Sequence, residues 1–298
     1  MRTSLWISAE NTWDDIVTMA RHAESTGWDG IWIADHFMQF DDNRLEVPTQ
    51  ECFSLLAGLA AAVPRVRLGS LVAGNTYRHP AVLMKQAATI DAISGGRLVL
   101  GLGAGWQENE HRRFGIPLGT TKERLAWFEE ACQVVIGLRD DERATFAGER
   151  YQLDEAPLVP KPVGPLPLLI GASGEQKMPQ VVARYADEWN HWSVPDTWKA
   201  KRAIYDAALD AAGRDVGSLY RSTQALVFTG PDGLKTATDF QAIRPSIGGT
   251  PEQLIEQVGG WAEAGLDEWI VPTFTFLGME AALENMDLLI SEVAPAFR

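Results

Sequence analysis

Short runs of branched apolar residues alternate along this chain with longer segments in which apolar residues recur every three or four positions. The runs predict buried β-strands, and the periodic segments predict amphipathic helices. Residues 66–103 show the pattern clearly. A strand over 66–72 precedes a helix that His79-Pro80 opens and Gly95-Gly96 ends, and an apolar strand over 97–103 follows. Two strands joined by a crossover helix predict a βαβ unit with parallel strands.

The same alternation continues through the whole sequence. The predicted strands are residues 5–8, 30–34, 66–72, 97–103, 166–171, 186–192, 222–229 and 267–274. Eight strands alternating with helices predict an α/β fold, a (β/α)8 TIM barrel with insertions. An open doubly wound sheet fits less well, because no G-x-G-x-x-G follows the first strand.

Two stretches interrupt the alternation. A hairpin turning at Gly148 and a proline-rich run form an insertion at about residues 139–165, and residues 230–249 read as irregular and polar. Neither stretch looks like a linker, so we expect a single domain over residues 1–298. Helix starts are clearer, since Thr120 and Glu123 have the spacing of a capping box, and Thr250 is a strong N-cap followed by a proline at the first helical position.

Composition narrows the range of partners. The formal net charge of −14 argues against nucleic acid and anionic membranes as partners. The two cysteines and five histidines show no metal-ligand spacing, so we expect no metal site. The chain starts without a charged-then-apolar leader and has no run long enough to span a membrane. These features predict a cytoplasmic protein without disulfides that acts on a small molecule.

Candidate chemistry follows from the fold, because ligands bind at the carboxyl ends of barrel strands. Asp35 and His36 follow the second predicted strand, and His36 could serve as a general acid or base that Asp35 orients. The alternative is a histidine capped by loop backbone. Ser173-Gly174 follows the fifth strand, where a helix N-terminus would bind an anion, unless it is an ordinary turn.

The stretch GSLVAGNTYRHPAVLMKQAATIDAISGGRLVLGLGAGWQENEHRRFGIP resembles the core of the bacterial luciferase-like monooxygenase superfamily. FAGERYQLDEAPLVPKP, LLIGASGE, ARYADEWN and GTPEQ extend the similarity over nearly the whole chain, which is most similar to the coenzyme F420-dependent oxidoreductase branch. The resemblance implies a TIM barrel that binds a flavin or 5-deazaflavin at the strand carboxyl ends, usually as a dimer.

The resemblance also implies roles for single residues. The matched cofactor positions are Asp35, His36, Ser70, Leu71, Ala73, Gly105, Asn109, Ser173 and Gly174. Among these, Ser70-Leu71 matches a non-prolyl cis peptide behind the ring, and Ser173-Gly174 matches the phosphate contact. Glu10 matches an acid near the substrate pocket of the sugar-phosphate dehydrogenases. Those relatives have a catalytic glutamate where this chain has Trp106, which argues against glucose 6-phosphate and for an apolar or aromatic substrate.

The leading hypothesis is therefore an F420-dependent oxidoreductase, a homodimer that transfers hydride between the deazaflavin C5 and a small organic substrate. In it His36 contacts the ring or relays a proton, and Glu10 is a substrate-side acid or base. The main alternative is a monooxygenase that uses reduced FMN and oxygen on the same fold. Two others stay open: a barrel that binds cofactor without turnover, and a hydrolase that uses Glu10 and Asp35 as paired carboxylates.

Overall fold

The computed structural model describes residues 1–298, which group by their contacts into two compact units. The first unit comprises residues 1–8, 12–32 and 171–298, and the second comprises residues 9–11 and 33–170. A single domain over the whole chain stays a prediction.

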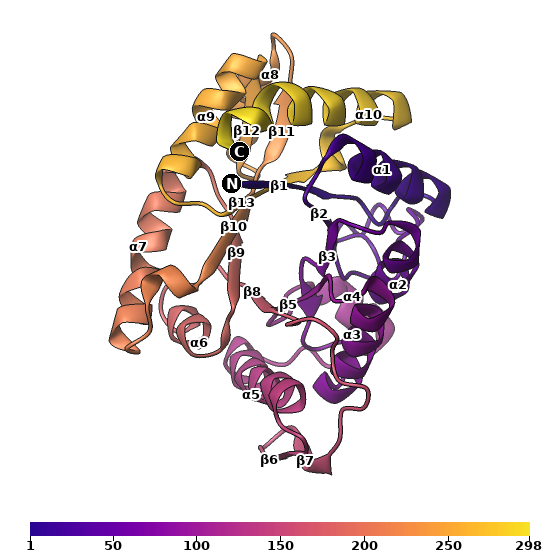
Figure 1. The fold of residues 1–298 in the computed structure, drawn as a ribbon, viewed down its shortest axis with the longest axis vertical. Coiled ribbons are helices and arrows are strands. Elements are labelled where there is room, and N and C mark those ends of the chain that lie inside the picture. The colour runs from indigo at the N-terminus through magenta and orange to yellow at the C-terminus, as the bar shows by residue number, and fades with distance from the viewer. The chain divides into compact units, whose positions relative to one another are not determined.

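The first unit is built on five parallel strands in the order β2–β1–β13–β10–β9 (Figure 1). Their bounds are β1 Arg2–Trp6, β2 Gly30–Ile33, β9 Glu188–Trp192, β10 Tyr220–Gln224 and β13 Glu268–Pro272. Five of the helices of this unit are α1 Trp13–Thr26, α6 Met178–Tyr185, α7 Pro195–Ala211, α9 Pro251–Glu263 and α10 Met279–Leu288. Strand side chains such as Leu5, Trp269 and Ile270 are fully buried, as expected for parallel strands covered by helices.

A small additional sheet in the first unit corrects one prediction. Residues 230–249 are not irregular, because they hold helix α8 (Gly233–Phe240) and strand β12 (Ser246–Gly249), which pairs in parallel with β11 (Leu226–Thr229). Figure 1 shows α8 beside these two strands. Ala237 is buried and Phe240 packs on Phe228 with ring centres 5.0 Å apart. The apolar positions of this short helix are few among polar ones, which hid its period.

The second unit contains the parallel strands β3 (Arg67–Ser70), β5 (Leu98–Gly103) and β8 (Leu168–Gly171), with β5 paired to both others. The two-residue strand β4 (Ala73–Gly74) pairs with the end of β5. The helices are α2 Cys52–Ala62, α3 Pro80–Ser94, α4 Glu108–Phe114 and α5 Thr121–Asp140.

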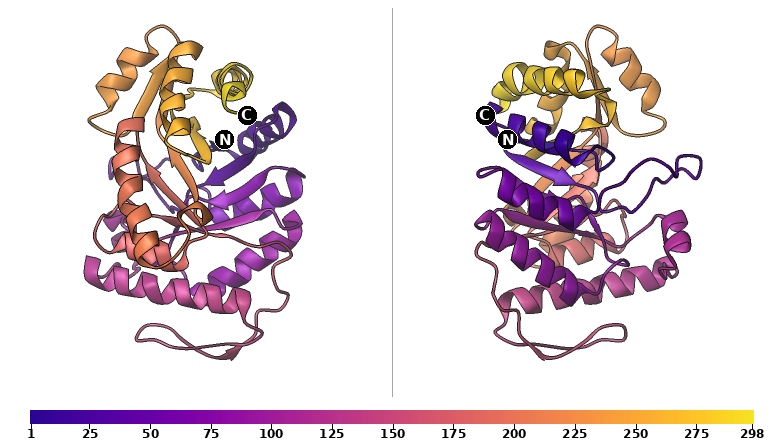
Figure 2. Two further views of the ribbon diagram at one scale, coloured as in Figure 1. Left: turned by 60° about the vertical axis from the view of Figure 1, so that its left-hand side comes forward. Right: turned by 90° about the vertical axis from the view of Figure 1, so that its right-hand side faces the viewer.

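The predicted hairpin is confirmed as the antiparallel pair β6 (Ala144–Ala147) and β7 (Gln152–Ala156), which lies next to α5 in Figure 2. Glu130 of α5 holds its turn, since the carboxylate accepts hydrogen bonds from the backbone N–H groups of Glu149, Arg150 and Tyr151, each at 3.0 Å.

The order of elements and the parallel pairing inside both units are those of a (β/α)8 TIM barrel, which confirms the predicted fold class. The predicted capping box at Thr120 with Glu123 is present, and the predicted N-cap Thr250 also forms a capping box, with Gln253. None of the helices has the length and apolar character needed to cross a membrane.

Asp91, a fully buried residue of α3, ties the proline-rich insertion to the second unit. Its carboxylate accepts hydrogen bonds from the backbone N–H groups of Val163 at 2.7 Å, Gly164 at 2.9 Å and Leu98 at 3.3 Å. An ionised acceptor surrounded by backbone donors is stabilised in place of the water it has lost.

We expect Asp91→Asn to lower the free energy of unfolding by about 1–3 kcal/mol, because the new amide group turns N–H bonds toward N–H donors. Urea unfolding followed by circular dichroism measures the change. Asp140→Asn is the control, since that exposed carboxylate pairs only with the neighbouring Arg139 on the surface and should change stability by less than about 1 kcal/mol. Equal effects of the two substitutions would contradict the assigned role of Asp91.

Candidate active site

Most of the predicted site residues lie in the second unit, at or beyond the carboxyl ends of strands. Asp35 and His36 follow β2, Ala73 forms β4, and Gly105 and Asn109 follow β5. Glu10 belongs to the same unit through residues 9–11. The carboxyl ends of parallel strands share one edge of a sheet, which is where barrel enzymes hold their ligands.

A buried carboxylate that the sequence analysis did not select organises this edge. Glu110 of α4 accepts a hydrogen bond from the backbone N–H of Phe37 at 2.9 Å and another from the Tyr77 hydroxyl. Its Oε1 lies 2.8 Å from Nδ1 of His36. The Glu110 side chain is fully buried, whereas the His36 side chain is 28% exposed.

The electrostatics of this cluster determine the tautomer of His36. Burial by itself favours the neutral acid, but the hydrogen bonds from His36, Tyr77 and Phe37 outweigh it and lower the pKa of Glu110 below its ordinary value. An ionised carboxylate only accepts, so Nδ1 of His36 carries a proton and Nε2 remains for a ligand. Burial, together with the Glu110 carboxylate, raises the pKa of Tyr77, so this hydroxyl stays a donor.

Asp35 does not orient His36, contrary to the prediction. Both of its oxygens bind Arg78, at 2.7 and 3.0 Å, and Oδ2 also accepts from the backbone N–H of Gly74 at 3.2 Å. Arg78 in turn binds Glu51 at 2.5 Å. Burial opposes the guanidinium charge, but the two carboxylates outweigh burial and raise the pKa of Arg78. Asp35 therefore joins the loop after β2 to the β4 segment. Because both of its carboxylate oxygens already have partners, the structure does not support a hydrolase that uses Glu10 and Asp35 as paired carboxylates.

The predicted cis peptide lies one bond later than expected, between Leu71 and Val72 rather than Ser70 and Leu71. Ser70 itself is buried, and its hydroxyl donates to the carbonyl of Gly101 at 2.8 Å while accepting from the N–H of Gly101 at 3.0 Å. The Ser70 hydroxyl thus links β3 to β5 and is not available to a cofactor. Ala73 is fully buried at the same edge.

Gly105 adopts a φ of +85°, and a Cβ there would lie 2.7 Å from the hydroxyl oxygen of Thr76. Thr76 is held in turn, with its hydroxyl 2.6 Å from Nε2 of His111, whose Nδ1 lies 2.6 Å from the carbonyl of Gln107. Since a carbonyl only accepts, Nδ1 of His111 carries the proton and Nε2 accepts from Thr76. Backbone conformation and close packing both require glycine at position 105.

Asn109 and Glu10 have structural partners. The Asn109 amide donates to the carbonyls of Gln39 and Phe40 at 3.0 Å each, which fixes the loop after β2. Glu10 is 37% exposed at its side chain and lies 3.4 Å from Arg44. If Asn109 contacts a cofactor, it must do so through its backbone or after its side chain changes partners. Glu10 is open to solvent.

Trp106 stands beside His36, with ring centres 5.6 Å apart at an interplanar angle of 79°. The residue is 57% exposed, so a large apolar face is available next to the imidazole. A flat ligand could cover that face, as the predicted apolar or aromatic substrate would require.

Ser173 and Gly174 belong to the first unit and do not sit at a helix N-terminus as predicted, because α6 begins only at Met178. Their carbonyls are held from α7, by Lys201 on Ser173 at 2.8 Å and by the Tyr205 hydroxyl on Gly174 at 2.9 Å. Both residues are exposed, so this fixed loop remains open to an anionic group.

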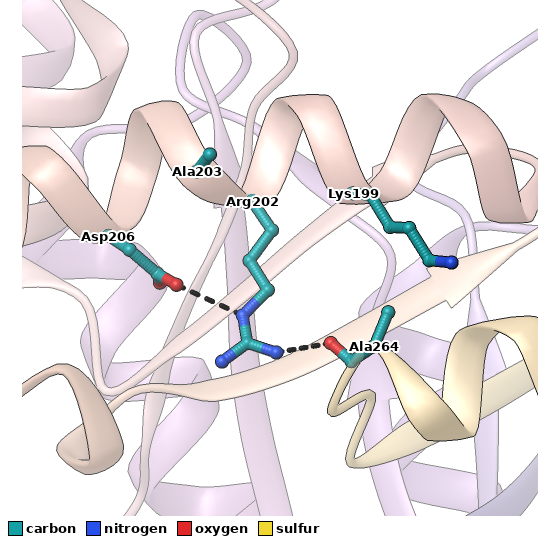
Figure 3. A pocket seen from close by; sticks show the side chains of 5 residues that line it. All are labelled: Lys199, Arg202, Ala203, Asp206 and Ala264. Carbon is teal, nitrogen blue, oxygen red and sulfur yellow. Dashed lines mark hydrogen bonds and ion pairs between the residues drawn. The ribbon is translucent and has the colours of Figure 1, made fainter.

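A cavity of about 230 Å³ lies elsewhere on the first unit, at the surface of α7 (Figure 3). Its lining residues are Lys199, Arg202, Ala203, Asp206 and Ala264. Arg202 pairs with Asp206 at 3.0 Å and also donates to the carbonyl of Ala264. The charge of Arg202 is thus already paired, so we assign the cavity no role. No group of three or more His, Cys, Asp or Glu side chains is arranged to hold a metal ion.

Residues 1–244 match the sequence model of the luciferase-like monooxygenases. The chain belongs to this family. The F420-dependent glucose-6-phosphate dehydrogenase of Kineococcus radiotolerans is 28% identical over 259 residues, covering 84% of this chain and 69% of that protein. The pyrimidine monooxygenase RutA of Allorhizobium ampelinum is 29% identical over 260 residues, covering 82% and 70%. Three further F420-dependent glucose-6-phosphate dehydrogenases match over only 50 to 58% of their length.

The fold of the family is equally clear among solved structures. An F420-dependent secondary alcohol dehydrogenase in complex with an F420-acetone adduct superimposes with a TM-score of 0.85 at 20% identity, over 100% of both chains. The monooxygenase RslO1 of Streptomyces bottropensis gives 0.83 at 17% identity. These structures show the shared fold, while the match of residues 1–244 confirms luciferase-like family membership. The predicted oxidoreductase class agrees with the F420-dependent dehydrogenases among its relatives.

We expect Glu110→Gln to allow the proton of neutral His36 to move from Nδ1 to Nε2. The glutamine amide can donate where the carboxylate only accepts, so Nδ1 no longer has to carry the proton. Nitrogen NMR of the ¹⁵N-histidine-labelled protein should show His36 protonated at Nδ1 in the wild type and redistributed toward Nε2 in the variant. An unchanged His36 signal would show that Glu110 does not control the imidazole.

The lowered pKa of Glu110 also predicts a pH dependence of stability. A carboxylate with a depressed folded-state pKa stabilises the protein above its unfolded pKa of about 4.3, and that stabilisation is lost as pH falls through the folded value. The difference in unfolding free energy between wild type and Glu110→Gln should therefore shrink between about pH 6 and about pH 3.5. A difference that is constant over this range would contradict the ionised state of Glu110.

Proposed function

We propose that this protein is an F420-dependent oxidoreductase that transfers hydride between the deazaflavin C5 and a small apolar or aromatic organic substrate. The observation that carries the proposal is the His36–Glu110 pair, 2.8 Å apart at the strand carboxyl ends, with Nε2 of His36 free for a ligand. The F420-dependent names of its relatives support the choice of cofactor.

The residues present fit the pyrimidine edge of a flavin-type ring, which offers carbonyl oxygens and a ring N–H. The side-chain amide nitrogen of Asn75 is buried without a hydrogen-bond partner, directly after β4. A carbonyl oxygen of the ring could accept a hydrogen bond from this amide nitrogen, which has no partner in the protein. His36, Asn75 and the backbone at Gly105 would hold the ring. The phosphate contact at Ser173-Gly174 rests on the family resemblance alone.

When bound, the cofactor supplies the hydride chemistry, and the chain supplies position and proton control. His36 can hold or accept a proton at Nε2, because Glu110 keeps the other proton on Nδ1. Trp106 offers its face beside the imidazole for a flat substrate. Glu10 is the weaker candidate for a substrate-side acid or base, since it pairs with Arg44.

A monooxygenase that uses reduced FMN and oxygen is the second candidate. The match to the pyrimidine monooxygenase covers nearly as much of this chain as the match to the dehydrogenase does, 82% against 84%. The His36–Glu110 pair suits either cofactor, since both share the pyrimidine edge. Homodimer assembly and a cytoplasmic location stay predictions.

The test is a parallel fluorescence titration of the purified protein with F420 and with FMN, repeated on Ser173→Asp. We expect F420 to bind at micromolar concentration or tighter, FMN to bind weakly, and Ser173→Asp to weaken F420 at least about tenfold by placing a carboxylate beside the phosphate. Reduced F420 should then pass hydride to acceptors without oxygen uptake.

A preference for FMN with substrate-dependent oxygen consumption would favour the monooxygenase. Binding of neither cofactor would overturn the proposal. Asp187→Asn serves as a control for Ser173→Asp, because it changes a charge in the same unit at the amino end of β9, opposite the edge where ligands bind.

A further inference from the structure

Three aromatic side chains of the first unit meet where its strands end. Trp6 closes β1, Trp192 closes β9, and Phe274 follows β13. The ring centre of Trp6 lies 5.5 Å from that of Trp192 and 5.0 Å from that of Phe274. Phe274 is 38% exposed, so the cluster reaches solvent. It offers an apolar surface at the end of the strands that holds ligands in this fold.

A cation without an anionic partner lies on this cluster. The guanidinium carbon of Arg244, in the loop between α8 and β12, is 4.7 Å from the ring centre of Trp192. Arg244 is half-buried, yet its side chain makes no hydrogen bond or ion pair with the protein, and burial lowers its pKa. Arg221 in the same unit is different, since its buried guanidinium binds Asp206 at 2.7 Å.

Partial burial of a guanidinium whose N–H groups have no acceptors carries a desolvation free-energy penalty, which a ligand that accepts hydrogen bonds from it would offset. Its planar fork matches a carboxylate, which two parallel N–H bonds can bind. One cation matches a single negative charge. The neighbouring rings of Trp192, Trp6 and Phe274 can pack against an apolar or aromatic group that carries the carboxylate.

We propose that Arg244 binds the carboxylate of an aromatic organic acid whose apolar part packs on Trp192, Trp6 and Phe274. This binding site belongs to the first unit alone and goes beyond the proposed oxidoreductase function. The acidic tail of F420 carries the same carboxylate chemistry, so the experiment must separate the two sources.

The probes are 3-phenylpropionate and the matched neutral 3-phenylpropionamide, titrated calorimetrically into the protein with and without F420. We expect the acid to bind at least about tenfold more tightly than the amide, as one charge-assisted hydrogen-bond pair would give. Arg244→Met, which keeps an apolar stem on Trp192, should abolish this preference and leave amide binding unchanged. Arg244→Lys should restore part of it.

Arg2→Met is the matched control. Arg2 also lies over an aromatic ring, 5.4 Å from the centre of Tyr220, but at the amino end of β1. It should retain the full preference for the acid. If wild type binds acid and amide equally, or if Arg244→Met weakens both alike, the inference is wrong.

A third arm measures the affinity for F420 in wild type and Arg244→Met. Weaker F420 binding with an unchanged preference for the acid would assign Arg244 to the cofactor tail and overturn the inference. The titrations without F420 decide the inference even if the protein binds no F420, so failure of the proposed function is distinguishable from failure of this one.

Discussion

A carboxylate taken out of water has to be surrounded by donors, and the candidate site depends on that requirement at Glu110. Its oxygens take the backbone N–H of Phe37, the hydroxyl of Tyr77 and the imidazole of His36. The loop after β2, the segment after β4 and helix α4 are thereby joined at one point. The orientation of His36 is consequently a property of three elements rather than of the loop that carries it.

The other buried charges of the second unit are satisfied in the same way. Arg78 bridges Asp35 and Glu51, and the guanidinium of Arg97 donates to the backbone carbonyls of four residues. Some buried polar atoms, by contrast, have no hydrogen-bond partner in the protein. The orphaned amide of Asn75 and the unpartnered guanidinium of Arg244 mark places where the protein's own groups leave a donor for something else.

The fold could be predicted because its signals are local. Strand runs, helix caps such as Thr120 and Thr250, and glycine stops lie within a few residues of the elements they define. Glu110 could not be selected, since its partners His36 and Tyr77 lie 74 and 33 residues away in the sequence. Adjacency suggested that Asp35 orients His36, but in the loop after β2 Asp35 binds Arg78 while His36 binds Glu110.

Charge explains why a single unpaired arginine can matter in so acidic a protein. A net charge of −14 repels anionic ligands at long range, but salt screens that field beyond about 8–10 Å. Inside that distance the nearest charge dominates, and next to Trp192 it is the cation of Arg244. An anionic ligand would therefore be repelled from most of the surface and bound beside Arg244 and Trp192. Selectivity would arise from that contrast, with the aromatic rings discriminating among acids by their apolar parts.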